Sequence, residues 1–375
     1  MSKKTWIGIV IVCGIALSAI VCRNVGPNNK EAIQVGTILP LTGGAAAVGK
    51  ASLNGMQLAV DEFNNKRPTG SPGVTLAIED DRAEPATGVS AFQKLLAAHN
   101  TKLVLGPLTS GVTIAVAPLA ERNRIVILSP GASAPPITNA GDYIFRNELS
   151  ESYGARSQAD LASSRLNFKS VALLYVNNEY GVGTVRIFRE RFEQLGGHIV
   201  ADEAFNTGAT DFRTALTKIK TAKPDAMFVV FQDDIVNVVQ QRAELGITIP
   251  IYTTPVFEDA SNLKKLGSLA EGIVYTYYGS FDPSANTGVT ADFVRAYQAR
   301  FGEPPTYYAA LGYDAAGIML SALRDAQFDQ AKVKDILYKV QKYQGVTGDT
   351  SFDQNGDVMK PVSLKIVRGG QFVQY

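Results

Sequence analysis

Residues 170–205 read SVALLYVNNEYGVGTVRIFRERFEQLGGHIVADEAF and carry the clearest sign of the architecture. The apolar run 170–176 precedes a helical pattern near 181–195, and a second strand candidate follows at 198–205. A near-continuous apolar run is typical of a strand that a parallel sheet buries on both faces. A strand, a helix and a strand at this spacing predict a βαβ unit.

The same alternation continues on both sides of this unit. Upstream, strand candidates lie at 33–39, 74–80, 102–106, 124–129 and 143–147, with helical patterns at about 49–64, 85–98, 110–123 and 152–166. Downstream, helical patterns near 211–221 and 235–245 alternate with strand candidates at 225–231, 249–254 and 272–278. Each series builds its own sheet, so we expect an α/β fold with two doubly wound, Rossmann-like lobes and right-handed crossovers.

The remaining segments do not make a third domain. Helical patterns at 291–301, 309–324 and 332–342 precede 350–358 and 362–375, which predict a strand pair around an Asn-Gly turn. We expect the chain to cross between the lobes near residues 147, 277 and 345, which makes a hinge and a cleft. The predicted division is a signal peptide at 1–22, a tether at 23–31, a first lobe of 32–147 plus 278–344, and a second lobe of 148–277 plus 345–375.

The composition excludes several classes of function. The 375 residues include 36 basic and 35 acidic side chains, a formal net charge of +1. A nucleic-acid binder needs clustered basic charge, so we expect no nucleic-acid partner. The chain has 2 Cys and 2 His, too few for zinc fingers, iron–sulfur clusters or a disulfide scaffold. We expect neither a metal nor a cofactor.

The first 22 residues predict export. Lys3 and Lys4 form a short basic region, and residues 6–21 carry no charge. This pattern is typical of a signal peptide and is short for a membrane-spanning helix. Cys22 ends the apolar run, where bacterial lipoprotein signals place the lipidated cysteine. Cleavage near Ala19 and an uncleaved anchor are the alternatives, and each delivers the rest of the chain outside the cytoplasm.

Two loops of the first lobe predict a ligand site. Open α/β sheets bind ligands outside the carboxyl ends of their strands. GPLTSG (106–111) turns from a strand into a helix, where free N–H groups and the Ser110 hydroxyl favour an anion. SPGASAPP (129–136) offers small residues and the hydroxyl of Ser133. Together the loops suit a small carboxylate, although a helix N-cap at Ser110 and an ordinary loop are the alternatives.

The chain resembles the periplasmic solute-binding proteins of the branched-chain amino-acid (Leu/Ile/Val) class, which feed ABC importers. The likeness runs from about Ile33 to the C-terminus and rests on seven segments: 35–64, 78–89, LVLGPLTSG (103–111), ILSPGASAPPIT (127–138), YIFRN (143–147), YVNNEYGVG (175–183) and AEGIVYT (270–276). The resemblance implies a type I, Venus-flytrap fold with a three-crossing hinge. It also implies a monomeric, non-catalytic receptor that passes a small solute to an ABC permease in the membrane. A ligand-sensing receptor of the same fold is the alternative.

The resemblance also implies roles for individual residues. It places the ligand carboxylate on Ser110 and Ser133, with the Gly131 carbonyl and the Ser133 hydroxyl facing a ligand ammonium. Tyr180 of the second lobe would close over the ligand, and Phe231 falls where family members often carry an aromatic. Ala132, between Gly131 and Ser133, completes this ligand-binding set.

Two departures leave the ligand open. Family members that bind α-amino acids usually place an acid after the strand equivalent to 249–254, and Pro255 stands there. The nearby acids are Glu258, Asp259, Asp233 and Asp234. The first loop carries Val48 where some relatives carry a large aromatic, which predicts a roomier pocket. An amino acid, an amine-free carboxylate and an amide therefore remain candidates.

Two enzyme classes compete with this interpretation. Residues 44–50, GAAAVGK, have the GxxxxGK spacing of a phosphate-binding loop, and 227–234 could serve as the acidic strand of an NTPase. Position 51 is Ala, however, where the magnesium ligand should be Ser or Thr. A hydrolase is the other rival, but no GxSxG elbow occurs, and His99 and His198 are expected at the surface. We expect no enzymatic activity.

Overall fold

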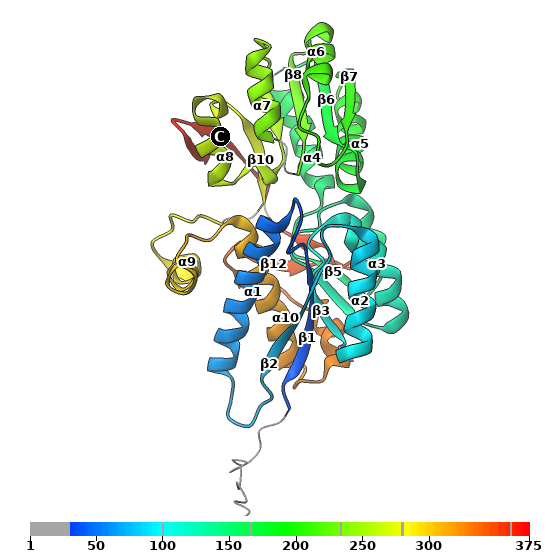
Figure 1. Ribbon diagram of the computed structural model, residues 1–375, viewed down its shortest axis with the longest axis vertical. Coiled ribbons are helices and arrows are strands. Elements are labelled where there is room, and N and C mark those ends of the chain that lie inside the picture. The colour runs from blue at the N-terminus through cyan, green and yellow to red at the C-terminus, as the bar shows by residue number, and fades with distance from the viewer. Residues whose placement is uncertain (1–30, 100, 166, 233–234, 279–280, 361) are drawn as a thin grey trace, which may run out of the picture.

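The structure is a computed structural model that describes residues 31–99, 101–165, 167–232, 235–278, 281–360 and 362–375. It has two lobes, one above the other in Figure 1. The signal peptide, Cys22 and most of the tether lie outside the described residues, as do Asp233 and Asp234. Within the described part of the chain, no helix combines the length and apolar character needed to cross a membrane.

The first lobe is built on a five-stranded parallel sheet with the order β2-β1-β3-β4-β5. Its strands are β1 (Ile33–Leu39), β2 (Val74–Asp80), β3 (Leu103–Leu105), β4 (Val126–Ser129) and β5 (Ile144–Arg146). Its helices are α1 (Ala46–Lys66), α2 (Pro85–His99), α3 (Ser110–Asn123), α10 (Tyr307–Asp325) and α11 (Val333–Leu337). Successive β3 residues face opposite cores: Leu103 packs with α1 and α10, and Val104 packs with α2 and α3. The near-continuous apolar runs are thus explained by burial on both faces.

The second lobe contains a seven-stranded sheet with the order β15-β14-β10-β9-β8-β6-β7. Its strands are β6 (Ser170–Val176), β7 (His198–Phe205), β8 (Ala226–Val230), β9 (Ile251–Thr253), β10 (Val274–Tyr278), β14 (Val362–Arg368) and β15 (Gln371–Gln374). Its helices are α4 (Glu151–Asp160), α5 (Glu179–Gln194), α6 (Arg213–Ala222), α7 (Ile235–Glu244) and α8 (Ala260–Leu266). A further helix, α9 (Gly288–Phe301), follows the return crossing. The α/β fold with two doubly wound lobes is confirmed.

The strand pair predicted for 350–358 and 362–375 is wrong. The Asn355-Gly356 turn joins β12 (Gly348–Phe352) to β13 (Val358–Met359), and β12 also pairs with β11 (Tyr343–Gly345). This small sheet packs against the first lobe, whereas β14 pairs antiparallel with β10 of the second. The chain therefore makes its third passage between the lobes near residue 360, not near 345 (Figure 1). Hydrophobic patterning predicts strands, but it does not say which sheet a strand joins.

Helices α1 and α10 pack closely because each has a glycine at the contact. A Cβ atom on Gly55 would lie 2.0 Å from the carbonyl oxygen of Ala309, and one on Gly312 would lie 2.2 Å from that of Ser52. Only residues without a side chain allow the two backbones to approach to this distance. This contact places the start of α10, and the tyrosines there, beside the first lobe's sheet.

Candidate functional site

Two loops meet at the carboxyl ends of β3 and β4. Ser110 is the first residue of α3, and its Oγ accepts a hydrogen bond from the backbone N–H of Ala134, 3.1 Å away. Ser129, the last residue of β4, donates from its Oγ to the carbonyl of Pro107 at 2.6 Å. These two bonds join the loop 106–110 to the loop 129–134. The serine hydroxyls are therefore held beside the first turn of α3, where backbone N–H groups favour an anion.

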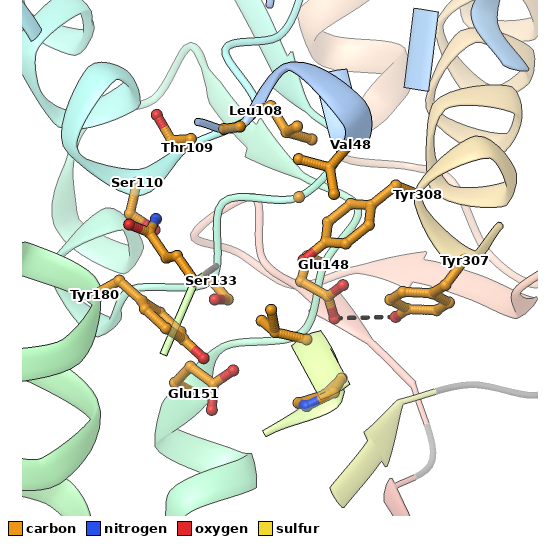
Figure 2. A pocket seen from close by; sticks show the side chains of 15 residues that line it. Val48, Leu108, Thr109, Ser110, Ser133, Glu148, Glu151, Tyr180, Tyr307 and Tyr308 are labelled. Atoms are coloured by element: carbon orange, nitrogen blue, oxygen red, sulfur yellow. Dashed lines mark hydrogen bonds between the residues drawn. The ribbon is translucent and has the colours of Figure 1, made fainter. Parts of the chain in front are cut away.

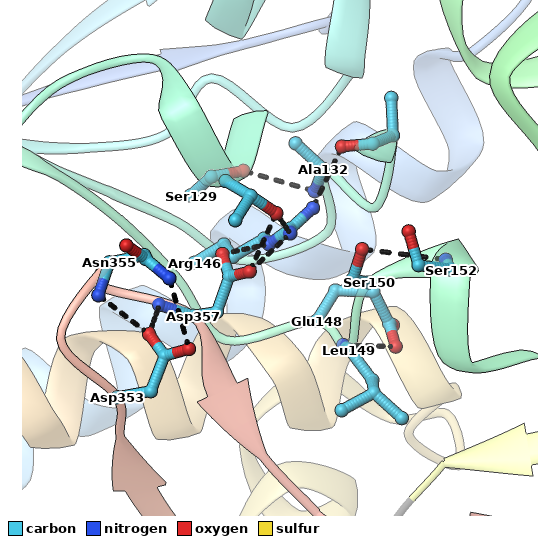
Figure 3. A network of polar contacts seen from close by, with 12 residues as sticks. Ser129, Ala132, Arg146, Glu148, Leu149, Ser150, Ser152, Asp353, Asn355 and Asp357 are labelled. Atoms are coloured by element: carbon cyan, nitrogen blue, oxygen red, sulfur yellow. Dashed lines mark hydrogen bonds and ion pairs between the residues drawn. The ribbon is translucent and has the colours of Figure 1, made fainter. Parts of the chain in front are cut away.

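Arg146 supports the loop 129–134 through a hydrogen bond to its backbone. Its side chain is completely buried, and its Nη1 donates to the carbonyl of Ala134 at 2.9 Å. Nε and Nη2 donate to the two carboxylate oxygens of Asp357 at 2.7 and 2.8 Å, and Nη2 also donates to Thr138. Figure 3 shows this network. A bidentate pair of this kind fixes orientation as well as charge, so the loop that carries Ser133 has a rigid base.

The loops form one wall of a cavity between the lobes (Figure 2). The cavity encloses about 670 Å³ of space outside the atoms, counting the solvent at its mouth. The lining residues are Ala45, Val48, Leu108, Thr109, Ser110, Gly131, Ser133, Glu148, Glu151, Tyr180, Gln232, Pro255, Val256, Tyr307 and Tyr308.

Most of the residues singled out from the sequence come together here. Ser110, Gly131, Ser133 and Tyr180 line the cavity, and so do the further candidates Val48 and Pro255. Ala132 lies behind the wall: it is completely buried, and its N–H donates to Ser129 Oγ at 3.0 Å. Phe231 is 1% exposed and packs in the core of the second lobe, while the next residue, Gln232, reaches the cavity.

Tyr180 dominates the wall contributed by the second lobe. It lies in the first turn of α5, and its hydroxyl donates to Thr254 Oγ1 at 2.7 Å. Burial raises the pKa of Tyr180 well above its usual value. The phenol therefore stays neutral at physiological pH. Nearby, the Asn178 side-chain amide donates to Gln232 Oε1 at 2.8 Å and orients that amide.

The acids that follow Pro255 do not reach the cavity. Glu258 forms an ion pair with Lys365 at 2.6 Å and accepts a hydrogen bond from the Tyr275 hydroxyl. Asp259 caps α8 by accepting from the N–H of Ser261. Both carboxylates already have structural partners within the second lobe.

Two acids that sequence reasoning missed line the cavity instead. Glu148 lies on the first crossing between β5 and α4, and Glu151 is the first residue of α4. They are 5% and 2% exposed. Burial raises the pKa of Glu148 to about 7, against the opposing effects of Lys360, the Tyr307 hydroxyl, the Leu149 N–H and Arg146. The only signal in the sequence was their position directly after YIFRN (143–147), at an expected crossing.

Tyr307 and Tyr308 were missed as well. Both belong to the first turn of α10, and the Tyr307 hydroxyl donates to Glu148 Oε1 at 3.2 Å. With Val48 and Leu108 they give the cavity an aromatic and aliphatic side opposite Tyr180 (Figure 2). Their helix follows the second crossing, so their place in the cleft depends on how the lobes meet.

The motifs of the rival enzyme classes do not form sites. Helix α1 begins at Ala46, so most of GAAAVGK (44–50) is helical and cannot wrap around a phosphate, and Lys50 is exposed. His198 is an exposed residue at the start of β7, and His99 ends α2. Among the described residues, no group of three or more His, Cys, Asp or Glu side chains is arranged to hold a metal ion.

Comparison with known proteins identifies relatives along almost the whole chain. The family described as periplasmic binding protein matches residues 32–371. Leu/Ile/Val-binding protein homolog 2 of Brucella abortus is 26% identical over 358 residues, which cover 92% of each chain. Leu/Ile/Val-binding protein BraC3 of Rhizobium johnstonii is 36% identical over 200 residues, about half the length of either protein (52% of this chain and 53% of that one).

Solved structures share the fold. The branched-chain amino-acid transporter substrate-binding protein LivJ of Streptococcus pneumoniae, in complex with isoleucine, is 31% identical with a TM-score of 0.82. That match covers 91% of this chain and 97% of LivJ. A solute-binding protein of an ABC transporter from Rhodopseudomonas palustris, in complex with 3,4-dihydroxybenzoic acid, is 26% identical with a TM-score of 0.81 and covers 92% and 95% of the two chains.

Proposed function

The chain belongs to the periplasmic binding protein family, and from that premise we propose that its interlobe cavity captures a small solute for an ABC importer. The observation that carries the proposal is a cavity whose walls come from both lobes. Ser110 and Ser133 on one wall face Tyr180 and Gln232 on the other. Approach of the lobes buries the solute, and the closed form docks on the membrane permease. Binding shifts the balance of open and closed forms, and no covalent bond changes.

The serine wall is the receptor for a ligand carboxylate. The hydroxyls of Ser110 and Ser133 and the free N–H groups at the start of α3 supply donors without a basic side chain. The two similar solved structures hold isoleucine and 3,4-dihydroxybenzoic acid, and both compounds carry a carboxyl group. An amino acid, an amine-free carboxylate and an amide all fit a wall of this kind.

The remaining part of the proposal concerns export. Residues 1–22 direct the chain out of the cytoplasm, and the alternatives at its new N-terminus are a lipid-modified Cys22 and a cleaved soluble form. The mass of the mature protein distinguishes them, because a diacylated N-terminal cysteine adds several hundred daltons. The mature protein acts as a monomer and carries out no catalysis.

A thermal-shift screen of the mature protein tests the proposal. A solute that binds only the folded state raises the melting temperature. The panel contains amino acids, their amides, aliphatic acids and aromatic acids. The only Trp of the chain is Trp6, within the signal peptide, so a dye or calorimetry must report unfolding. Failure of every compound to shift the melting temperature would refute the proposed function.

A further inference from the structure

One buried ammonium lies beside the passages between the lobes. Lys360 is 7% exposed, and it is the only buried lysine among the residues that the structure describes. Its Nζ donates to the carbonyl and the side-chain oxygen of Asn147, each at 3.0 Å, and to Thr347 Oγ1 at 2.7 Å. An ammonium has three N–H donors, so these acceptors use all of them.

The partners of Lys360 come from segments next to all three passages. Lys360 itself follows β13 at the start of the third passage, and Asn147 follows β5 at the start of the first. The Asn147 side chain also donates to the carbonyl of Leu311 at 3.3 Å, in α10, which follows the second passage. The Thr347 hydroxyl donates to Asp314 of the same helix. One ammonium therefore holds together the first-lobe side of the hinge.

Glu148 is the next residue after Asn147, and it belongs to the cavity. Its side chain lines the wall and accepts hydrogen bonds from the Tyr307 hydroxyl at 3.2 Å and from the Leu149 N–H at 3.0 Å (Figure 2). The Asn147 side chain thus contacts Lys360 while its neighbour faces the cavity. Because a single planar peptide bond joins the two residues, the hold of Lys360 on Asn147 also places Glu148.

Lys360 also acts on Glu148 through its charge. Burial raises the pKa of Glu148 to about 7, and Lys360 makes the largest of the contributions that oppose this rise. The same ammonium favours the ionised form of Asp314. The other charged or titratable groups around Glu148 are Arg146, Glu151, Tyr180, Tyr277, Tyr307 and Tyr308. Arg146 is the other cation of this set, and its guanidinium pairs with Asp357.

We propose that Lys360 is a positioning residue for solute binding, which fixes Asn147 and sets the place and the charge of Glu148 in the cavity. This inference rests on the proposed function, because it concerns a solute between the lobes, and it holds for every solute class considered above. A solute that meets Glu148 is thereby connected to the hinge through Lys360. The coupling is reciprocal, so the state of the ammonium network alters the affinity for the solute.

Carbon-13 NMR of protein labelled at its glutamate side chains tests the effect on charge. The carboxyl resonance that is missing in Glu148→Gln belongs to Glu148. We expect it to titrate near pH 7 in the wild type and at a higher pH in Lys360→Met, because the charge that favours ionisation is gone. Lys339→Met, at an exposed position, is the control and should leave the titration unchanged. The same midpoint in wild type and Lys360→Met would overturn the inference.

Calorimetry at pH 6 and pH 8 tests the effect on binding. The probes are L-isoleucine, benzoate and benzamide, none of which ionises between these values. For a probe that binds, we expect the wild-type affinity to differ at least threefold between the two pH values, because Glu148 changes charge beside it. Glu148→Gln should remove this difference, and Lys360→Met should reduce it. A wild type without the difference, or a difference unchanged in Lys360→Met, would overturn the inference and leave the proposed function intact.

The wild type alone provides a further check, so the test does not depend on variants that fold. Nitrogen-15 NMR detects lysine ammonium groups whose protons exchange slowly, a condition that burial and three hydrogen bonds give to Lys360. A bound probe should shift this resonance, and an unshifted resonance at saturation would overturn the inference. If no compound of the thermal-shift panel binds, the proposed function fails, whereas the titration of Glu148 still decides whether Lys360 sets its charge.

Discussion

Arg146 and Asp357 are 211 residues apart in the chain and form a bidentate pair with bonds of 2.7 and 2.8 Å. Arg146 ends β5, just before the first crossing, and Asp357 precedes β13, just before the third. The pair therefore joins the starts of two crossings, and Arg146 also holds the carbonyl of Ala134 in the loop 129–134. The hinge and the serine wall share this one support.

Loss of one partner of this pair should strongly destabilise the protein. We expect Asp357→Ala to lower the free energy of unfolding by about 3–5 kcal/mol, because a completely buried guanidinium is left without its counter-charge. Denaturant unfolding measures the change. As a control, Asp325→Ala breaks the exposed ion pair with Arg324 and should cost less than about 1 kcal/mol. Equal effects of the two variants would contradict the role assigned to burial.

The two serines should carry much of the affinity for the ligand carboxylate. We expect Ser110→Ala combined with Ser133→Ala to weaken binding at least tenfold, which corresponds to about 1.4 kcal/mol. Calorimetry with the best ligand of the screen measures this. Ser90→Ala, at an exposed site on α2, is the control and should leave the affinity unchanged. Undiminished binding by the double variant would refute the assignment of the serine wall.

Closure of the lobes should depend on a glycine at their contact. A Cβ atom on Gly183 of α5 would lie 3.0 Å from Pro135 Cδ in the first lobe. We expect Gly183→Leu to hold the lobes apart and to weaken binding about tenfold, because the closed form becomes less populated. Small-angle scattering of the variant with ligand should show a larger radius of gyration. Val182→Leu, at a 45% exposed position beside it, should behave like wild type.

Asp81 should make the protein less stable as the pH rises. Burial raises its pKa to about 6, Asp80 adds to this, and its Oδ2 has no hydrogen-bond partner among the described residues. Between about pH 4 and 6 the folded state therefore binds more protons than the unfolded state. The free energy of unfolding falls with increasing pH in this window. We expect Asp81→Asn to remove that slope and to stabilise the protein at pH 8 by up to about 2 kcal/mol.

A second aspartate provides a control of opposite sign. Backbone N–H groups of Lys169 and Ser170 lower the pKa of Asp225, so its ionised form stabilises the fold, and that contribution is lost as the pH falls. Asp225→Asn should therefore lower the melting temperature at pH 7, whereas Asp81→Asn should raise it at pH 8. Shifts of the same sign in the two variants would contradict the burial argument.

The contact between α1 and α10 should not tolerate a methyl group. Alanine is the better helix former by about 1 kcal/mol, yet we expect Gly312→Ala to destabilise the protein by about 1–3 kcal/mol. The added Cβ would lie 2.2 Å from the Ser52 carbonyl oxygen, so the helices must separate. Thermal unfolding measures the effect. Ser321→Ala on the same helix is the control, and a stabilised Gly312→Ala variant would show that the helices can move apart freely.

Periodicity in the sequence predicted the lobes well because their central strands are buried on both faces. It also placed Ser110 and Ser133, since the carboxyl ends of parallel strands meet at one edge. The family resemblance, not periodicity, suggested Phe231 for the site. Side chains alternate in an extended chain, and a difference of one residue sends Phe231 to the core and Gln232 to the cavity. Glu148 and Glu151 were missed because an acid at a crossing between the lobes can face either water or the cavity. The packing of the lobes decides between the two, and the sequence does not give that packing.

The topology also dictates an order of assembly during synthesis. The second sheet receives β14 and β15 only at residues 362–374, and the first lobe receives α10 and the small sheet only after the chain has returned from the second. Neither half can therefore be completed while the ribosome is still adding the last residues. Because both lobes are completed late, the chain stays unfolded for longer during synthesis. An unfolded chain is the form that passes through a narrow translocation channel. The crossings between the lobes that form the hinge therefore suit a polypeptide that is exported before it folds.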